Sequence, residues 1–183
     1  PGVPMATLKP VDTFDLLIFG GAGDLSLRKL LPALYHRDGA GQLPAGSRVL
    51  AIGRNKISQG SFLSLVEDTL RVRLKDLDPN QWARFAERLS YLSLNAEDSA
   101  SWDLLCEHLA GFEDRLRAIY LATPPHLFGT IARGFKARAL ITDKMRIVLE
   151  KPVGHDEASA RRINDEVGAC FEENQIYRID HYL

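Results

Sequence analysis

Five short apolar segments along the chain have the pattern of buried strands. Each is continuous and rich in Ile, Leu, Val and aromatic residues, as strands covered on both faces of a parallel sheet are. The predicted strands are Asp15–Phe19, Arg48–Ile52, Tyr91–Leu94, Ala118–Ala122 and Arg146–Glu150. Between these segments the apolar residues change to helical spacing, which predicts that strands and helices alternate.

Each helical period places its apolar side chains on one face. The predicted faces are Leu27, Leu30, Leu31 and Leu34; Phe62, Leu65, Val66, Thr69 and Leu70; Trp102, Leu105, Cys106 and Leu109; and Leu127, Phe128, Ile131 and Phe135. Asp76–Pro79 divides one long helical region into two helices, and Asp156 caps a further helix that runs through Val167. Strands that alternate with helices pair in parallel through right-handed crossovers. The predicted class is α/β, with a doubly wound, mostly parallel sheet.

Composition and charge describe an ordinary globular protein. The 183 residues carry 23 basic and 24 acidic side chains, and 45% of them are hydrophobic, which suits a single domain with a core of its own. The balanced charge favours no nucleic-acid partner, and no apolar run approaches the roughly 18 residues of a membrane span. Because the N-terminus lacks the pattern of a signal peptide, we expect a cytoplasmic protein.

The two cysteines and the first residues carry no predicted chemistry. Cys106 and Cys170 lie far apart without CxxC spacing, so we predict reduced core thiols with no redox or metal role. Residues 1–12 are interpreted as a cloning remnant, Pro1–Pro4, followed by a flexible N-terminus. The predicted domain therefore comprises residues 13–183.

The stretch LIFGGAGDLSLRKLL joins the first predicted strand to its helix through a glycine-rich turn. Such a turn lets the backbone approach a ligand, and the N–H groups and dipole of the following helix favour an anion. The spacing Gly21-x-Gly23-x-x-Ser26 is a loosened dinucleotide fingerprint with serine at the third small position. The alternative is a tight turn that uses glycine only for positive φ. Since an acid would repel a phosphate, we expect Asp24 to turn inward and cap backbone N–H groups.

The end of the second predicted strand distinguishes between two dinucleotides. An NAD site would carry an acid there to bind the ribose hydroxyls, whereas this strand is followed by Arg54, with Lys56 close behind. A guanidinium can bind a 2′-phosphate through two N–H groups. The sequence therefore favours NADP, the alternative being a solvated surface arginine.

Proline motifs follow the fourth and fifth predicted strands. Pro152 keeps Lys151 out of helical geometry and permits a cis bond, which places a charged side chain at the carboxyl edge of the sheet, where ligands bind. The alternative is a strand terminator with a surface lysine. Thr123–Pro125 ends the fourth strand and begins a helix, and we expect this loop to border the coenzyme.

Four motifs together resemble the glucose-6-phosphate dehydrogenase family, and the resemblance covers nearly the whole chain from Asp15. They are GGAGDLSLRKLLPALY, YLATPPHLFGTI, RIVLEKPVGHD and YRIDHYL. That family oxidises glucose 6-phosphate to 6-phosphogluconolactone with NADP, at the entry to the pentose phosphate pathway. The resemblance implies this activity for the full-length protein, on a Rossmann-like coenzyme domain. The coenzyme-binding residues that it implies are Gly20, Gly21, Ala22, Gly23, Asp24, Leu25, Ser26, Leu27, Arg54 and Lys151.

The resemblance also assigns a substrate site near the end of the chain. Lys151, His181 and Tyr182 would bind the sugar phosphate, and Asp180 would orient the catalytic histidine. A histidine that acts as a general base needs a carboxylate to hold its tautomer and to stabilise the imidazolium that forms. Without the resemblance, Asp180–Tyr182 is more typical of an edge strand with ordinary polar residues.

The chain departs from the family pattern in what it lacks. The family continues RIDHYL with Gly-Lys, and a later β+α domain carries the catalytic histidine and the sheet that forms a homodimer or tetramer. Ala51 also replaces a glycine that is common before the 2′-phosphate arginine. We therefore expect an inactive fragment, truncated at the start of the substrate site. The alternative is a stand-alone nucleotide-binding or sensor module without redox chemistry.

Overall fold

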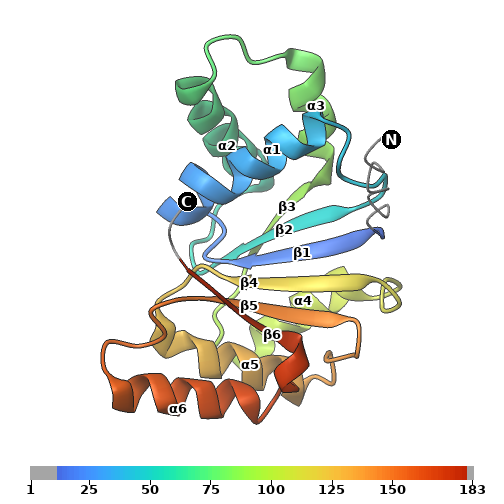
Figure 1. Cartoon of the computed structure of the whole chain (residues 1–183). Helices are drawn as coiled ribbons and strands as arrows, with labels where there is room; N and C mark the ends of the chain where they lie inside the picture. Colours follow the sequence, from blue (N-terminus) through green and yellow to red (C-terminus); the bar gives the residue numbers. More distant parts are fainter. Residues whose placement is uncertain (1–11, 181–183) are drawn as a thin grey trace, which may run out of the picture.

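A computed structural model of the chain describes residues 12–180, which contain a six-stranded sheet (Figure 1). The strands are β1 (Phe14–Phe19), β2 (Arg48–Gly53), β3 (Leu89–Ser93), β4 (Leu116–Leu121), β5 (Met145–Glu150) and β6 (Ile176–Ile179). They pair in parallel in the order β3-β2-β1-β4-β5-β6. The order reverses between β1 and β4, so the two halves of a doubly wound sheet meet there.

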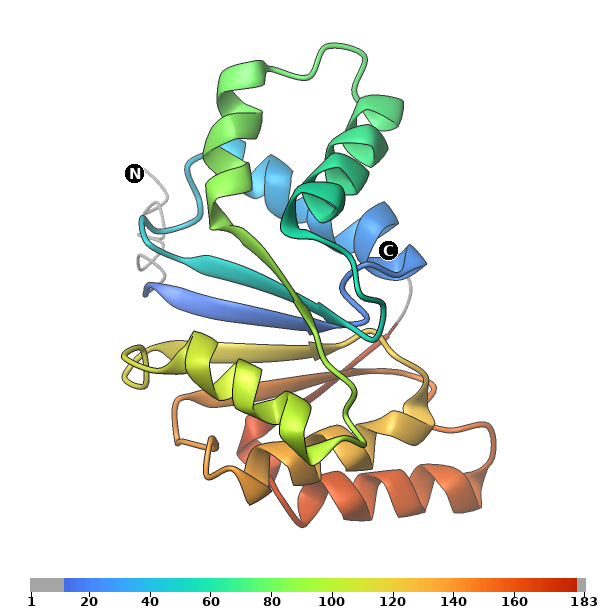
Figure 2. The same ribbon diagram turned by 180° about the vertical axis from the view of Figure 1, so that it is seen from behind.

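Helices cover both faces of this sheet (Figures 1 and 2). One face carries α1 (Leu31–Gly39), α2 (Gln59–Arg73) and α3 (Pro79–Arg88), and the other carries α4 (Trp102–Leu109), α5 (Phe128–Ala137) and α6 (Glu157–Gly168). Successive strand residues point to opposite faces. In β1, Ile18 therefore belongs to the core under the first three helices, and Leu17 and Phe19 belong to the core under the last three.

The α/β class and the doubly wound parallel sheet are confirmed, and the five predicted strands lie within two residues of the observed bounds. The hydrophobic pattern did not reveal β6. This strand has only four residues, and on one face its side chains Tyr177 and Ile179 are 50% and 37% exposed. The alternative interpretation placed an edge strand at Asp180–Tyr182, but the observed edge strand ends at Ile179, before Asp180, and His181 and Tyr182 lie outside the described residues.

Two predicted helix faces differ from the observed burial. A π-helical turn, Ser26–Leu30, precedes α1, and the buried residues of this region are Ser26, Leu31 and Tyr35 rather than a full leucine stripe. The wider π turn shifts the following residues away from a 3.6-residue period. In α2, Leu65 is 39% exposed. The buried face there recurs at four-residue spacing and consists of Phe62, Val66 and Leu70.

The predicted helix boundaries are confirmed. Asp78 caps α3 by accepting a hydrogen bond from the N–H of Asn80, so the region Asp76–Pro79 does separate two helices. Asp156 caps α6 by accepting from the N–H of Ser159. Within residues 12–180, no helix combines the length and the apolar character needed to cross a membrane.

Cys106 and Cys170 are free thiols, as predicted, but both are half-buried rather than enclosed in the core. Cys170 packs against the core that lies under α4, α5 and α6. The predicted N-terminal remnant and flexible segment lie outside the described residues, except for Asp12.

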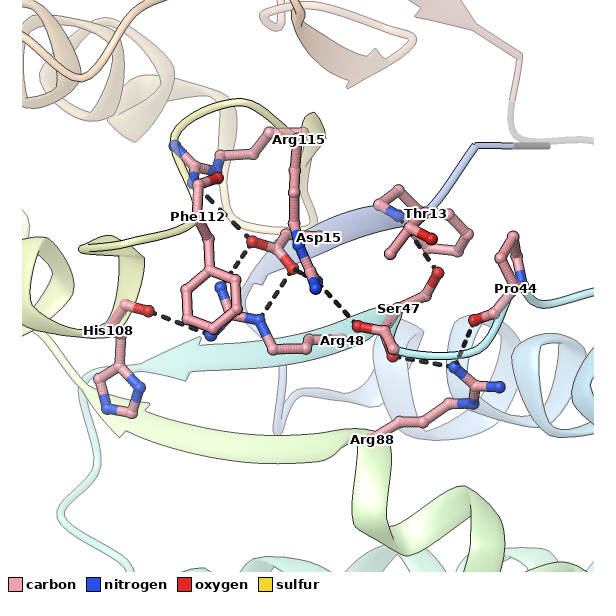
Figure 3. Close-up of polar contacts among 12 residues, drawn as sticks. Thr13, Asp15, Pro44, Ser47, Arg48, Arg88, His108, Phe112 and Arg115 are labelled. Carbon is pink, nitrogen blue, oxygen red and sulfur yellow. Dashed lines mark hydrogen bonds and ion pairs between the residues drawn. The ribbon is translucent and has the colours of Figure 1, made fainter.

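A buried carboxylate ties the strands together at the amino edge of the sheet (Figure 3). Asp15, 2% exposed, accepts hydrogen bonds from Arg48 Nε and Nη2 at 2.9 and 2.6 Å and from Arg115 Nη1 at 3.0 Å. Both guanidinium groups also lie over the ring of Phe112. Burial by itself would raise the pKa of Asp15, but the hydrogen bonds and charges of Arg48 and Arg115 outweigh it and hold that pKa below its ordinary value.

Candidate functional site

The turn after β1 brings the backbone against the ends of β2 and β4. The N–H groups of Gly20 and Gly21 both donate to the carbonyl oxygen of Ile52, at 2.8 and 3.0 Å. Gly20 has a φ of +79°, and a Cβ on it would lie 2.5 Å from the carbonyl oxygen of Ala122. Because no side chain fits this space, glycine is required for the turn to pass so close to the end of β4.

The helical backbone begins directly after this turn, at Asp24. Ser26 is fully buried, as expected for the third small position, and its Oγ has no hydrogen-bond partner among the described residues. The prediction for Asp24 was wrong. Its side chain is 78% exposed and pairs with Arg28 Nε at 2.9 Å, and within residues 12–180 no side chain caps the helix start. Asp24 and Arg28 are four residues apart, so their side chains meet on the helix surface. The arginine therefore partly neutralises the negative charge of Asp24 beside the turn.

The glycine turn forms one wall of a pocket of about 270 Å³ at the carboxyl edge of the sheet. Residues from Gly53–Asn55, Leu94–Glu97 and Ala122–Pro124 form the other walls. The pocket lies where the strand order reverses, which is where doubly wound sheets bind their ligands. The predicted border loop does reach it, through Thr123 and Pro124. The backbone of the glycine turn and the side chain of Arg54 line the same pocket, and both kinds of group bind phosphates, so the pocket fits a nucleotide.

Arg54 lines this pocket from the segment that follows β2. It is exposed, and its guanidinium has no hydrogen bond or ion pair within residues 12–180. Sequence reasoning missed Tyr91, Asn95 and Glu97, which line the same pocket from β3 and the loop after it. These residues lie far from the glycine turn in the sequence, and only the pairing of β3 with β2 brings them to it.

Lys151 lies at the carboxyl end of β5, where the structure brings it beside Asp180. The N–H of Lys151 donates to the carbonyl oxygen of Ile179 at 2.8 Å, which continues the pairing of β5 with β6. Its Nζ lies 3.8 Å from Asp180 Oδ1, and both side chains are at least half exposed. The bond from Lys151 to Pro152 is cis, which the proline motif permitted.

A phenol from β4 supports the same edge and was not predicted. Tyr120 Oη donates a short hydrogen bond to the carboxylate of Glu150, the last residue of β5. Burial, the hydrogen bond to Glu150 and its negative charge raise the pKa of Tyr120 above its ordinary value. The predicted substrate-binding residues His181 and Tyr182 lie outside the described residues.

Comparison with known proteins identifies the family of this domain. Residues 17–183 match a family model described as glucose-6-phosphate dehydrogenase, NAD binding domain. The chain belongs to this family. It is 44% identical over 176 residues to glucose-6-phosphate 1-dehydrogenase of Rhizobium meliloti strain 1021, a match that covers 95% of this chain and 36% of that protein. It is 42% identical over 183 residues to the enzyme of that name from Mycolicibacterium smegmatis, covering 97% and 37%.

Solved structures in the glucose-6-phosphate dehydrogenase family share the fold. The crystal structure of glucose-6-phosphate 1-dehydrogenase from Mycobacterium avium matches with a TM-score of 0.84 at 32% identity, over 93% of this chain and 36% of that one. The chain thus spans about 36% of the length of these relatives. Both comparisons support a dinucleotide-binding domain of the glucose-6-phosphate dehydrogenase family, and neither supports the alternative of a stand-alone sensor module.

Proposed function

We propose that this chain is the NADP-binding domain of an enzyme that oxidises glucose 6-phosphate to 6-phosphogluconolactone and passes the hydride to NADP. The relatives carry the name glucose-6-phosphate 1-dehydrogenase. A further family structure, described as a complex with its substrate glucose-6-phosphate, matches with a TM-score of 0.79 at 27% identity, over 96% of this chain and 38% of that one. The observation that carries the choice of NADP is the Arg54 guanidinium, which lines the pocket beside the glycine turn and has no partner within residues 12–180.

In this proposal the glycine turn and the helix after it hold the coenzyme pyrophosphate. The turn offers bare backbone, and the helix start adds free N–H groups and the positive end of its dipole. Arg54 binds the 2′-phosphate, and the coenzyme supplies the hydride acceptor when bound. The full set of coenzyme-binding residues is Gly20, Gly21, Ala22, Gly23, Asp24, Leu25, Ser26, Leu27, Arg54 and Lys151.

The substrate end of the proposed site centres on Lys151. An ion pair between two groups as exposed as Lys151 and Asp180 contributes little, so the amine is free to turn toward a phosphate. Lys151, His181 and Tyr182 bind the sugar phosphate, and Asp180 orients the catalytic histidine. We assign residues 13–183 to the coenzyme domain. We place the histidine, and the contacts of a homodimer or tetramer, in the length of the relatives that this chain does not span.

Replacing Arg54 with alanine tests the choice of coenzyme. A hydrogen bond to a charged group contributes about 1.5–3 kcal/mol, so Arg54→Ala should weaken NADP binding roughly 10- to 150-fold. NAD binding should change less than about threefold, because NAD lacks the 2′-phosphate. Isothermal titration of the purified chain with each coenzyme measures both effects. Arg161→Ala, which removes an exposed arginine of α6, is the matched control, and an equal loss for NADP and NAD in Arg54→Ala would contradict the proposal.

A second measurement tests whether the site is complete. With its general base placed elsewhere, the 183-residue chain should form no NADPH from NADP and glucose 6-phosphate, as followed by absorbance. Turnover by the purified chain, at a rate that Lys151→Ala lowers, would show instead that these residues include a working base.

A further inference from the structure

The loop that carries Arg54 is held at three successive peptide carbonyl groups by β3 and by Leu94, the residue that follows it. The carbonyl oxygen of Gly53 accepts from the N–H of Leu94 at 2.8 Å. That of Arg54 accepts from Ser93 Oγ at 3.4 Å, and that of Asn55 accepts from Tyr91 Oη at 2.6 Å. The first bond is a backbone bond, but the other two come from side chains. The path of the chain through Arg54 therefore depends on which side chains β3 presents at its carboxyl end.

Tyr91 is itself fixed from several sides. Its ring packs on Phe62 of α2 with the centroids 5.2 Å apart. Its N–H donates to Gln59 Oε1 at 2.9 Å, and Gln59 Nε2 donates to the carbonyl oxygen of Leu89 at 2.8 Å. A Cβ at Gly53 would lie 2.8 Å from Tyr91 Oη, so the missing side chain leaves room for the hydroxyl. A phenol is protonated at neutral pH and can donate this bond, and burial raises the pKa of Tyr91 further above its ordinary value.

The guanidinium of Arg54, by contrast, has no partner within residues 12–180. A long side chain without partners is placed by its backbone, and a backbone held at neighbouring carbonyl groups restricts where the guanidinium reaches. We propose that Tyr91 and Ser93 are positioning residues that direct Arg54 toward the 2′-phosphate of the coenzyme, so that β3 sets the preference for NADP. This inference rests on the proposed function and adds a specificity determinant to it.

Tyr91→Phe isolates the hydroxyl, because the ring and its packing remain. The probes are adenosine 2′,5′-bisphosphate and adenosine 5′-phosphate, which differ only in the 2′-phosphate, titrated into the full 183-residue chain. Tyr91→Phe should weaken the 2′,5′-bisphosphate roughly 2- to 12-fold, the range for one lost hydrogen bond, and leave the 5′-phosphate within twofold. Ser93→Ala should act in the same direction with a smaller effect, because its bond is longer. Tyr177→Phe, at a half-exposed phenol on β6, is the matched control.

A double variant separates positioning from general damage. If Tyr91 acts through Arg54, adding Tyr91→Phe to Arg54→Ala should not weaken the 2′,5′-bisphosphate further. The inference would be overturned if Tyr91→Phe weakened both ligands equally or weakened neither. It would also be overturned if Tyr91→Phe had its full effect on the 2′,5′-bisphosphate in the Arg54→Ala background. If Arg54→Ala itself spares the 2′,5′-bisphosphate, the proposal of NADP binding fails. If Arg54→Ala weakens it and neither Tyr91→Phe nor Ser93→Ala does, only the positioning role fails.

Discussion

The Asp15 carboxylate lies within ion-pair distance of three arginines rather than one. Besides Arg48 and Arg115, Arg117 Nη2 lies 3.8 Å from Asp15 Oδ2 while donating to the carbonyl oxygen of Phe112 at 3.0 Å. Arg117 is only 2% exposed, and its Nε has no partner among the described residues. Burial is the main influence that lowers the pKa of Arg117, partly offset by the Asp15 charge. Removing that charge would leave a buried cation without compensation.

We predict that Asp15→Asn destabilises the domain by about 3 kcal/mol, near the low end of the range for breaking a buried ion pair, because Arg48 and Arg115 stay partly in water. The pKa of Asp15 is lower in the folded state than its ordinary 3.8. Its contribution is therefore fully present above about pH 4 to 5 and is lost as the pH falls through the lowered value.

Urea unfolding of wild type and Asp15→Asn between pH 7 and pH 3 measures this effect. The difference in free energy of unfolding should stay constant down to about pH 5 and shrink below pH 4. A difference that grows on acidification would show that the carboxylate is protonated in the folded state, contrary to the network observed. Asp143→Asn is a suitable control, since Asp143 is exposed.

Helices α4 and α5 meet through a glycine against an indole. A Cβ on Gly134 of α5 would lie 2.0 to 2.5 Å from atoms of the Trp102 ring. The ring cannot move away easily, because it packs on Phe135 and Phe19 and its Nε1 donates to the carbonyl oxygen of Ala96 at 3.1 Å. The spacing of these two helices therefore depends on the absence of one methyl group.

We predict that Gly134→Ala destabilises the domain by about 1–3 kcal/mol through overpacking, although alanine is the better helix former. Urea unfolding measures the loss, and near-ultraviolet circular dichroism should report a changed environment for Trp102. Gly60→Ala in α2 is the matched control, because nothing lies within 4 Å of a Cβ there, and it should be neutral or slightly stabilising. If both substitutions changed the free energy of unfolding equally, helices α4 and α5 would be able to move apart without loss of stability.

On the scale of the entire domain, three segments meet at the switch point of the sheet. They are the glycine turn, the loop that carries Arg54 and the loop that follows β4. A ligand that bridges them binds the folded state and not the unfolded chain. NADP at 100 times its dissociation constant should therefore stabilise the domain by about 2.7 kcal/mol. For a domain of this size that corresponds to a rise in Tm of roughly 5–10 °C.

Thermal unfolding followed by circular dichroism, with NADP or NAD at the same concentration, measures this linkage. NADP should give the larger shift, and Arg54→Ala should lower the NADP shift toward the NAD shift while leaving the NAD shift nearly unchanged. Equal shifts for both coenzymes in the wild type would argue against a 2′-phosphate contact. The described domain should show a single transition, since its two cores share one sheet.

Prediction from the sequence succeeded where the signal lay in neighbouring residues. The strands buried on both faces were found because they are continuous apolar runs, whereas β6 was missed because Tyr177 and Ile179 leave one of its faces open. Asp156 was recognised as a cap, while Asp24 was misassigned. Both are exposed acids at helix starts, and only the structure shows that Asp24 faces Arg28 rather than the backbone.

The sequence by itself determined the α/β class, the glycine turn and the arginine after β2, because periodicity, turn geometry and strand ends depend on residues adjacent in the chain. The tertiary structure alone decided that Tyr91 and Ser93 hold the Arg54 loop and that Asp15 binds arginines from two other segments. These contacts join residues from 33 to 100 positions apart. Their existence depends on strand order and register, which are set by how the whole sheet packs its two cores.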